Sequence, residues 1–276
     1  MSHAYALSNL LTGLAATAFT WSSAFTTGRN RLNDGLQDEL AAGSSTAQAS
    51  GQTLTVDLGS AQSVAAVALL NHNLATGACT VTVTYADDSG FTTGTGTAKA
   101  TSTVPTTAPN EKDLVLQFPA VSKRYWRLTF AHTGTKIVTL GELLLLGTIT
   151  TLSRRRIWGH GEEERFITNR VETSTGNTRS TFLSGPIRTK RLPFKDLRGT
   201  SERNEVMSMW RASKGGCLKL LWIDTVESTA TAATEEGMEC LWGKLQESLG
   251  WTEDDFSLYT PDAALELVGS GREAGS

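Results

Sequence analysis

The sequence contains few cysteines and no motif for a metal site or a covalent nucleophile. Its three cysteines form no C-x-x-C pair, and an odd number argues against a complete disulfide framework. Its four histidines are scattered, without the spacing of an H-E-x-x-H or His-x-His motif. A Walker-type glycine loop and a G-x-S-x-G nucleophile turn are also missing. We therefore expect no catalytic residue, no metal and no cofactor, and a protein that is not an enzyme.

Long apolar runs are missing as well. No stretch approaches the roughly 20 apolar residues that a membrane span needs. No lysine or arginine precedes Arg29, so the apolar start of the chain lacks the basic region of a signal peptide. We expect a protein that folds in a reducing cytoplasm and does not span a membrane.

The charge of the chain is weak overall but unevenly distributed. The 276 residues carry a formal net charge of −3. Residues 1–152 carry −1, residues 153–203 carry +6 and residues 204–276 carry −8. The overall charge gives no reason to expect nucleic-acid specificity. A basic block followed by an acidic block is nevertheless a marked feature of the second half.

Alternating apolar and polar residues predict strands in the first half of the chain. The alternating segments are 54–58, 81–85, 114–118 and 125–130, and residues 64–70 form an apolar run. Turn signals separate them, and the 27 threonines up to Thr151 suit a half-exposed pleated surface. Segments 44–51 and 92–107 are small and polar, which predicts two long loops, and residues 8–19 are the only candidate for a short helix. This half predicts an antiparallel β-sandwich.

The second half begins near residues 148–153 and follows a different pattern. Residues 200–213 predict a helix with Thr200 or Ser201 as N-cap, Glu202 in the first turn, and a buried stripe that includes Val206 and Met209. Strands are expected at 166–173, 187–194, 217–223, 241–247 and 263–268. The predicted class is mainly β: a β-sandwich domain at 1–149 and an α+β domain with one main helix at 150–276.

The first half resembles a discoidin-type, galactose-binding-like jelly roll. The resemblance rests on segments in the family's order, namely 54–59 (LTVDLG), 64–70, 81–85 (VTVTY), 123–128 (KRYWRL) and 140–147 (LGELLLLG). It covers about residues 20–149. Since members of this family bind glycans, lipids or proteins, or only support an assembly, the resemblance implies a fold more than a ligand.

The second half resembles the tail-tube-like β-sandwich domain of siphophage distal tail proteins. The matching segments are 171–176 (VETSTG), 191–194 (RLPF), the helix 201–212, Gly215-Gly216, 242–245 (WGKL) and 264–267 (ALEL). Such domains build rings that connect the tail tube to the baseplate hub. The resemblance implies a homo-oligomeric ring, hexameric or trimeric, at the virion tail tip. It also implies contacts with tail tube, tape measure and baseplate hub proteins, and assembly in the host bacterial cytoplasm. The leading position of the jelly roll departs from many distal tail proteins.

Three groups of residues are candidates for binding. Two are basic and are candidates for a ring or partner interface: Arg154, Arg155 and Arg156 with Trp158, and then Arg188, Lys190 and Arg191. A solvated linker is the alternative for the first of them. The third group is Asn71, His72 and Asn73, which could hold a glycan at the end of the sandwich or could instead stabilise a turn.

Three functions are compatible with these patterns. The leading hypothesis is a structural tail-tip protein in which complementary basic and acidic flanks join neighbouring subunits of a closed ring. The first alternative is a receptor-recognition protein of the tail that binds a host surface glycan, for which Trp21, Tyr125 and Trp126 are the candidate sugar platform. The second alternative is a glycan-degrading enzyme with an accessory module, which would need two carboxylates across a cleft.

Overall fold

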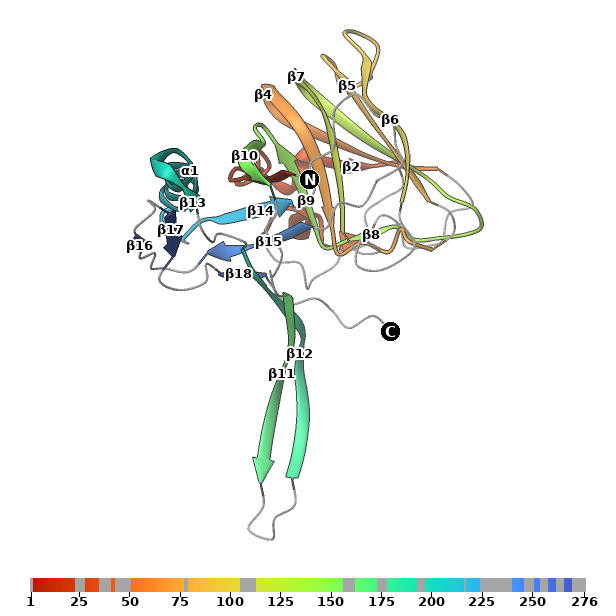
Figure 1. Ribbon diagram of the computed structural model, residues 1–276. Coiled ribbons are helices and arrows are strands. Elements are labelled where there is room, and N and C mark those ends of the chain that lie inside the picture. Colours follow the sequence, from red (N-terminus) through yellow and green to blue (C-terminus); the bar gives the residue numbers. More distant parts are fainter. Residues whose placement is uncertain are drawn as a thin grey trace. The chain divides into compact units, whose positions relative to one another are not determined.

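The chain forms two compact units, which we call the sandwich unit and the hairpin unit (Figure 1). The computed structural model describes residues 2–22, 28–34, 41–42, 51–76, 79–104, 113–155, 162–172, 178–192, 197–215, 217–223, 240–245, 251–253, 258–261 and 266–269. The sandwich unit comprises Ala4–Thr151 and Ile223–Cys240, and the hairpin unit comprises Met1–His3, Leu152–Trp222 and Leu241–Ser276. In sequence order, the sandwich unit is therefore inserted into the hairpin unit, whereas the sequence suggested domains at 1–149 and 150–276.

Strands dominate both units, so the predicted mainly β class is confirmed, with a single α-helix in the described part of the chain. The elements that lie wholly in the sandwich unit are two 3-10 helices and eight strands: η1 (Ala16–Ala18), β2 (Phe19–Trp21), η2 (Arg29–Leu32), β3 (Ala41–Ala42), β4 (Gln52–Leu70), β5 (Thr80–Ala86), β6 (Gly96–Thr103), β7 (Asp113–Ala131), β8 (Thr139–Leu140) and β9 (Glu142–Leu146). Strands β1 (Ser2–Ala6) and β10 (Thr150–Arg155) each cross the boundary between the units.

The two longest strands, β4 and β7, form the centre of the sandwich unit. Each has 19 residues, and they pair antiparallel from Gln52↔Phe130 to Leu70↔Asp113. The register shifts between Asp57 and Gln62 and again between Val64 and Ala66, which are bulges that bend the pair. The first half of β4 contributes to a layer with the order β2-β4-β7-β5-β6, and its second half pairs with β9. The strand pair β4–β7 therefore contributes residues to both layers of the sandwich.

The core lies between these layers and follows the predicted alternation. Leu54, Val56 and Trp126 are fully buried, whereas Thr53 and Thr55 between them are only half-buried. The indole of Trp126 packs against the rings of Phe118 and Tyr85, with centroids 5.7 Å away in each case, and its Nε1–H donates to the carbonyl of Lys123 at 3.2 Å. A buried indole with a satisfied N–H contributes a large apolar area without leaving a polar atom unpaired.

Two expectations for the sandwich unit were wrong. Segment 92–107 was expected to be one long loop, but residues 96–103 form β6, which pairs with β5. Threonine is well suited to such an edge strand. Because the segment is small and polar throughout, its composition predicted a loop and gave no sign of strand pairing. Residues 8–19 form a turn and the short η1 instead of a helix. The other loop, 44–51, lies outside the described residues except for Gly51.

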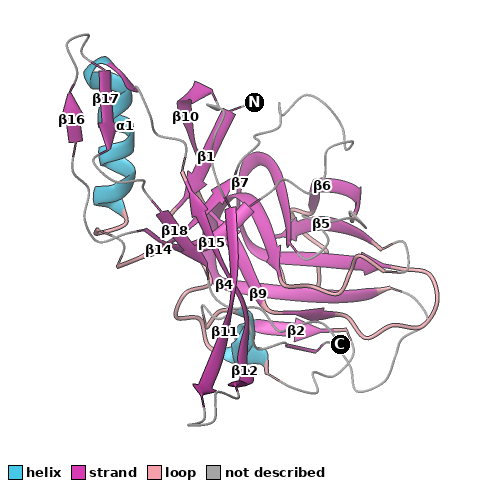
Figure 2. Cartoon of the chain, turned by 60° about the horizontal axis from the view of Figure 1, so that its bottom comes forward, coloured by secondary structure: helices cyan, strands magenta, loops and turns pink. Residues whose placement is uncertain are grey.

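The hairpin unit contains the helix and the remaining strands. Its elements are β11 (Glu162–Glu172), β12 (Thr178–Arg191), β13 (Leu197–Arg198), α1 (Gly199–Ala212), β14 (Lys219–Ile223), β15 (Cys240–Leu245), β16 (Trp251–Glu253), β17 (Leu258–Pro261) and β18 (Glu266–Gly269), of which β14 and β15 each extend by one residue into the sandwich unit. One sheet contains the order β14-β15-β18-β12-β11, and a small sheet, β13-β17-β16, lies beside α1 (Figure 2).

The predicted helix occurs at Gly199–Ala212, but the expected N-cap was wrong, since Thr200 and Ser201 lie within the helix. Val206 and Met209 are buried, Glu202 lies in the first turn and Arg211 in the last. The helix ends before Lys214 and Gly215, both of which have left-handed backbone conformations with φ of 54° and 61°. The N-terminal residues also belong to this unit, since the ring of His3 stacks on that of Trp222 at 5.3 Å.

Replacing Trp126 with alanine should lower the free energy of unfolding of the sandwich unit by about 3–5 kcal/mol, because the residual cavity would lie at the centre of the core. Native-state hydrogen exchange of the β4 and β7 amides measures this change. Thr97→Ala on the edge strand β6 serves as the control and should change the same quantity by less than about 0.5 kcal/mol. Equal effects of the two substitutions would contradict the assignment of the core.

Candidate functional site

The turn at residues 71–73 follows β4 and precedes β5 in the chain. Asn71 and His72 are buried, with exposed fractions of 4% and 3%, and Asn71 has a left-handed φ of 50°. The backbone N–H of Asn71 donates to Asp113 Oδ1 at 3.0 Å, and Nδ1 of His72 accepts from the N–H of Leu74 at 3.2 Å. Two of the three candidate glycan residues are thus folded into the turn itself.

The third residue of the turn, Asn73, connects it to β8 and the residues just before that strand. Its Nδ2 donates to the carbonyl of Ile137 at 2.7 Å, and its Oδ1 accepts from the N–H of Thr139 at 3.1 Å. These contacts favour the alternative interpretation of the segment, in which its polar side chains stabilise a turn. A glycan role for Asn71, His72 and Asn73 stays a prediction, and no contact in the described residues adds to it.

The aromatic residues considered as a sugar platform are mostly in the core. Trp126 is fully buried, as its phase with Leu128 and Phe130 predicted, and Trp21 is 5% exposed. Tyr125 is half-buried, and the guanidinium of Arg124 lies over its ring, 4.8 Å from the centroid. An extended aromatic platform is therefore not present at these three positions.

The basic candidates lie on strands of the hairpin unit or outside the described residues. Arg154 and Arg155 end β10, while Arg156 and Trp158 lie outside the described residues. Arg188, Lys190 and Arg191 end β12, and the register places each opposite an acidic residue: Arg188↔Glu164, Lys190↔Glu162 and Arg191↔Glu266. Part of the basic block thus lies at register positions opposite acidic residues of its own chain.

Polar side chains gather on the outer face of the layer β2-β4-β7-β5-β6. The strand register aligns one row of residues across five strands and a second row beside it. We call this surface the threonine face, and its threonines are Thr20, Thr53, Thr55, Thr82, Thr84, Thr97, Thr101 and Thr129. Each hydroxyl can donate and accept a hydrogen bond, and each methyl group adds apolar surface.

Arg127 lies in the middle of this face, facing Thr55 on β4 and Thr84 on β5 in the register. Its Nε–H donates to Thr55 Oγ1 at 3.2 Å. Its guanidinium carbon lies 3.7 Å from the centroid of the Phe91 ring, which comes from the loop between β5 and β6. Such a stacked cation and ring attract each other by about 0.5–1 kcal/mol at an exposed site.

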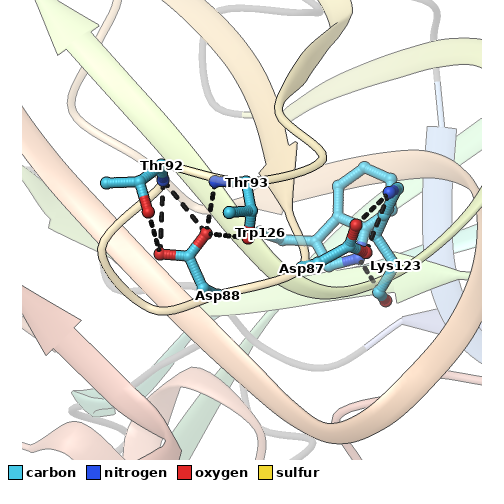
Figure 3. Close-up of polar contacts among 6 residues, drawn as sticks. All are labelled: Asp87, Asp88, Thr92, Thr93, Lys123 and Trp126. Atoms are coloured by element: carbon cyan, nitrogen blue, oxygen red, sulfur yellow. Dashed lines mark hydrogen bonds and ion pairs between the residues drawn. The ribbon is translucent and has the colours of Figure 1, made fainter.

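The loop that supplies Phe91 is organised by one carboxylate (Figure 3). Asp88 accepts from the backbone N–H groups of Thr92 and Thr93, and from both of their hydroxyls at 3.0 and 2.7 Å. The hydroxyl and N–H of Thr93, followed by those of Thr92, hold the pKa of Asp88 well below its usual range, because each stabilises the ionised carboxylate. The ionised carboxylate therefore fixes the loop.

A second polar contact connects this loop to β7. Lys123 Nζ donates to both oxygens of Asp87 at 2.8 and 2.7 Å (Figure 3). It also lies 5.9 Å from the centroid of the Tyr85 ring. Gly94 has a left-handed φ of 56°, and a Cβ there would collide with this ion pair. Glycine is therefore required at the point where the loop returns to β6.

The bend in β4 is also held by a charged pair. Arg124 donates to Asp57 in a bidentate manner, Nε to Oδ1 at 2.7 Å and Nη2 to Oδ2 at 2.9 Å, while the N–H of Gly59 donates to Oδ1 at 2.8 Å. The hydrogen bond from Arg124 is the main cause that lowers the pKa of Asp57, against a partial desolvation that raises it. The two arginines of the KRYWRL segment thus differ: Arg124 has a carboxylate partner, and Arg127 has a hydroxyl and a ring.

The sequence identified only part of this arrangement. The alternation of Tyr125, Arg127 and Thr129 with buried residues does place Arg127 on the outer face. Nothing in the sequence brought Phe91 to it, since the two residues meet only when the loop folds across the sheet. Among the residues that the structure describes, no group of three or more metal-ligating side chains is close enough to hold an ion, and no helix is both long and apolar enough to cross a membrane.

Comparison with known families identifies the fold of the sandwich unit. Residues 31–128 match the family model described as NedA-like, galactose-binding domain. The sandwich unit therefore contains a galactose-binding-like jelly roll, which confirms the fold expected for the first half. No curated protein matches the chain.

Several solved structures are similar to part of the chain. Chitosan-binding module 1 of a chitosanase/glucanase from Paenibacillus sp. IK-5 is 25% identical, with a TM-score of 0.39, over 51% of this chain and 99% of the module. CBM32-3 of a family 31 glycoside hydrolase from Clostridium perfringens is 14% identical, with a TM-score of 0.38, over 49% of this chain and 94% of that one. A GH29 fucosidase from Ruminococcus gnavus is 11% identical, with a TM-score of 0.39, over 51% of this chain and 27% of the fucosidase.

The lowered pKa of Asp88 can be tested by titrating its carboxyl carbon by NMR. The midpoint should lie below the ordinary value of 3.8. Because the pKa is lowered in the folded loop, the carboxylate stabilises the loop above 3.8, and this contribution is lost only as the pH falls through the lowered pKa. The amides of Thr92 and Thr93 should therefore remain protected from exchange at pH 4.

Thr93→Val is the matched control, since it removes the hydroxyl donor but keeps the shape of the side chain. It should move the midpoint of Asp88 back toward 3.8. A midpoint at or above 3.8 in the unmodified protein would show that the carboxylate does not hold the loop.

Proposed function

We propose that the protein is a structural, non-enzymatic tail-tip protein of a siphophage, in which copies of the chain form a closed ring through β11 and β12. The sandwich unit is its peripheral carbohydrate-binding-like module. The observation that supports this proposal is the way β12 is paired. It joins β18 only through Thr189–Arg191, while residues 178–187 pair with β11 alone among the described strands. The two strands form a ribbon that extends away from the rest of the sheet of the hairpin unit (Figure 1).

A two-stranded ribbon of this length is expected to be only marginally stable by itself. Isolated hairpins are marginally stable in water, and three or more strands are usually needed. Each outer edge also presents unpaired N–H and C=O groups, to which another chain can add a strand. The ribbon includes six large apolar residues, which add to the need for a partner: Phe166, Ile167, Val171, Phe182, Leu183 and Ile187.

A second copy of the chain is the partner that fits this requirement in a ring. Each ribbon offers two different edges, so an edge of one subunit can pair with the other edge of its neighbour. Such a heterologous contact closes into a ring when the rotation between subunits allows it. The sequence resemblance to distal tail proteins supports the same arrangement, with the tail tube, tape measure and baseplate hub proteins as neighbours and the host bacterial cytoplasm as the place of assembly.

The register changes the role proposed for the charges. The register places Arg188 and Lys190 opposite Glu164 and Glu162 of the same hairpin, so the proposal assigns these charges to the ribbon and not to a neighbouring subunit. The proposed contact between subunits is therefore backbone pairing along the ribbon. The charge pairs instead fix the register of the ribbon itself.

Glycan binding by the sandwich unit is a second candidate. The observations that favour it are the match of residues 31–128 to a galactose-binding family and the surface of hydroxyl groups on the threonine face. The two functions are compatible, because a ring can carry a binding module on each subunit. Avidity would then raise the affinity of the assembly above that of one module.

The ribbon proposal predicts the effect of a shortened hairpin. In this variant, residues 166–186 are replaced by Asn-Gly, which joins the paired residues Arg165 and Ile187 by a two-residue turn. Mass photometry and negative-stain microscopy of the unmodified protein should show a closed ring. The shortened variant should be monomeric, while its circular dichroism retains the signal of the sandwich unit.

A charge swap separates backbone pairing from side-chain attraction between subunits. The double variant Glu164→Arg with Arg188→Glu keeps opposite charges at the facing positions, and it should assemble like the unmodified protein. The single variant Arg188→Glu places two acids opposite each other and should weaken assembly. Rings of the shortened variant, or a monomeric unmodified protein, would overturn the proposal.

A further inference from the structure

Arg127 has unused hydrogen-bonding capacity on the threonine face. A guanidinium carries five N–H donors, and Nε–H of Arg127 is bonded to Thr55. No carboxylate and no other acceptor contacts its two terminal nitrogens within the described part of the chain. Arg124, three residues earlier on the same strand, donates from Nε and Nη2 to the carboxylate of Asp57. The difference between the two arginines identifies Arg127 as the one with donors available for a ligand.

The guanidinium is also held in place before any ligand arrives. Phe91 covers one face of it at 3.7 Å, and Thr55 fixes its Nε. With these two contacts, the long side chain of Arg127 has lost much of the freedom that binding would otherwise remove. The two terminal nitrogens form the remaining fork of donors, the geometry that binds a carboxylate through two parallel hydrogen bonds.

Phe91 adopts a strained backbone conformation that the rest of the loop stabilises. Its φ of 57° is left-handed, which costs a non-glycine residue about 1–2 kcal/mol. The four donors from Thr92 and Thr93 that bond Asp88, together with the N–H of Phe91 bonded to the carbonyl of Asp88 at 3.1 Å, hold the loop in this form. A strained residue held by its surroundings is a frequent feature of binding sites. Here the strain keeps an aromatic ring over Arg127.

The surroundings of Arg127 fit a polyhydroxylated molecule. In the register, its row runs Thr20, Thr55, Arg127, Thr84 and Thr97 across five strands, so hydroxyl groups flank the guanidinium on both sides. Neighbouring strands are about 4.8 Å apart, which is close to the length of one sugar ring. The pattern of one carboxylate receptor between rows of hydroxyls matches a sugar that carries both groups.

We propose that the threonine face is a binding site for a carboxylate-bearing glycan, with Arg127 as the receptor of the sugar carboxylate. The terminal nitrogens of Arg127 bind the two carboxylate oxygens, and the threonine hydroxyls exchange hydrogen bonds with the hydroxyls of adjacent sugars. Phe91 positions the guanidinium. The proposal deepens the glycan-binding candidate and rests on it, and it is independent of ring formation.

The test measures binding of four acidic probes to the full-length protein by isothermal titration calorimetry. The probes are oligogalacturonate, oligomannuronate, a hyaluronan oligosaccharide and sialyllactose, each compared with its carboxyl-reduced counterpart. At least one acidic probe should bind, with its reduced counterpart at least about tenfold weaker, since a charge-assisted bidentate contact is lost. The Nε resonance of Arg127 should shift in NMR spectra when that probe is added.

Variants at Arg127, Arg124 and Phe91 locate the binding. Arg127→Gln should weaken binding at least about tenfold, and Arg127→Lys, which keeps the charge but not the fork, should weaken it as well. Arg124→Gln is the matched control on the same strand and should leave the affinity within about twofold. Phe91→Gly permits the left-handed backbone but removes the ring, so it should weaken binding, whereas Phe91→Tyr should restore it.

The possible results separate this site from the glycan-binding function as a whole. Equal binding of acidic and reduced probes, unchanged by Arg127→Gln, would overturn the site and leave glycan binding in place. Binding of none of the acidic or reduced probes would overturn both. Loss of ring assembly in Arg127→Gln without any glycan binding would show that the face contacts a second copy of the chain, and it would also overturn the proposal.

Discussion

Backbone pairing between two long antiparallel strands is the interaction on which both units depend. In the sandwich unit, β4 and β7 pair over their length, and β2, β9 and β5 cover their outer edges. In the hairpin unit, β11 and β12 pair from Glu162↔Lys190 to Glu172↔Thr178, but β18 covers only Thr189–Arg191. The long central pair of the sandwich unit is thus flanked by further strands of the same chain, whereas most of the ribbon has no further strand beside it among the described residues. This difference is the basis for the proposed pairing with another chain. The proposed division of roles follows from this difference: the sandwich unit supplies a stiff face, and the ribbon supplies an edge for assembly.

The stiffness of the sandwich matters because the threonine face depends on register. A shift of β4 against β7 by one residue would turn Thr55 inward and expose Val56, and Thr55 would no longer lie opposite Arg127 on the outer face. The bulge at Asp57 and the buried indole of Trp126 both oppose such a shift. The pairing therefore determines the position of Arg127, and the loop held by Asp88 then brings Phe91 over it. The geometry around Arg127 therefore depends on both the packing of the core and the conformation of the loop.

Local periodicity was sufficient to predict much of the fold. The alternation at 54–58 and 125–130 gave the strands and the buried face, and the spacing of Val206 and Met209 gave the helix. The pattern failed at 96–103, where an edge strand has the composition of a loop, and it did not reveal that Met1–His3 belong with the hairpin unit. The contact between Phe91 and Arg127 also could not be predicted, because it depends on a left-handed residue and on pairing across β5 and β7. The polar residues Asn71 and His72, which the sequence offered as glycan ligands, make hydrogen bonds within and next to the turn that they form.

The central claim is that the chain is completed by strand pairing with another copy of itself. Electron cryomicroscopy of the purified full-length protein tests it most directly, because a map that resolves strands shows what lies next to residues 178–187 of β12. The account predicts a closed ring in which a strand of the neighbouring subunit pairs with this edge of the ribbon. A monomer, or a ring in which this edge faces solvent and the subunits meet elsewhere, would contradict it.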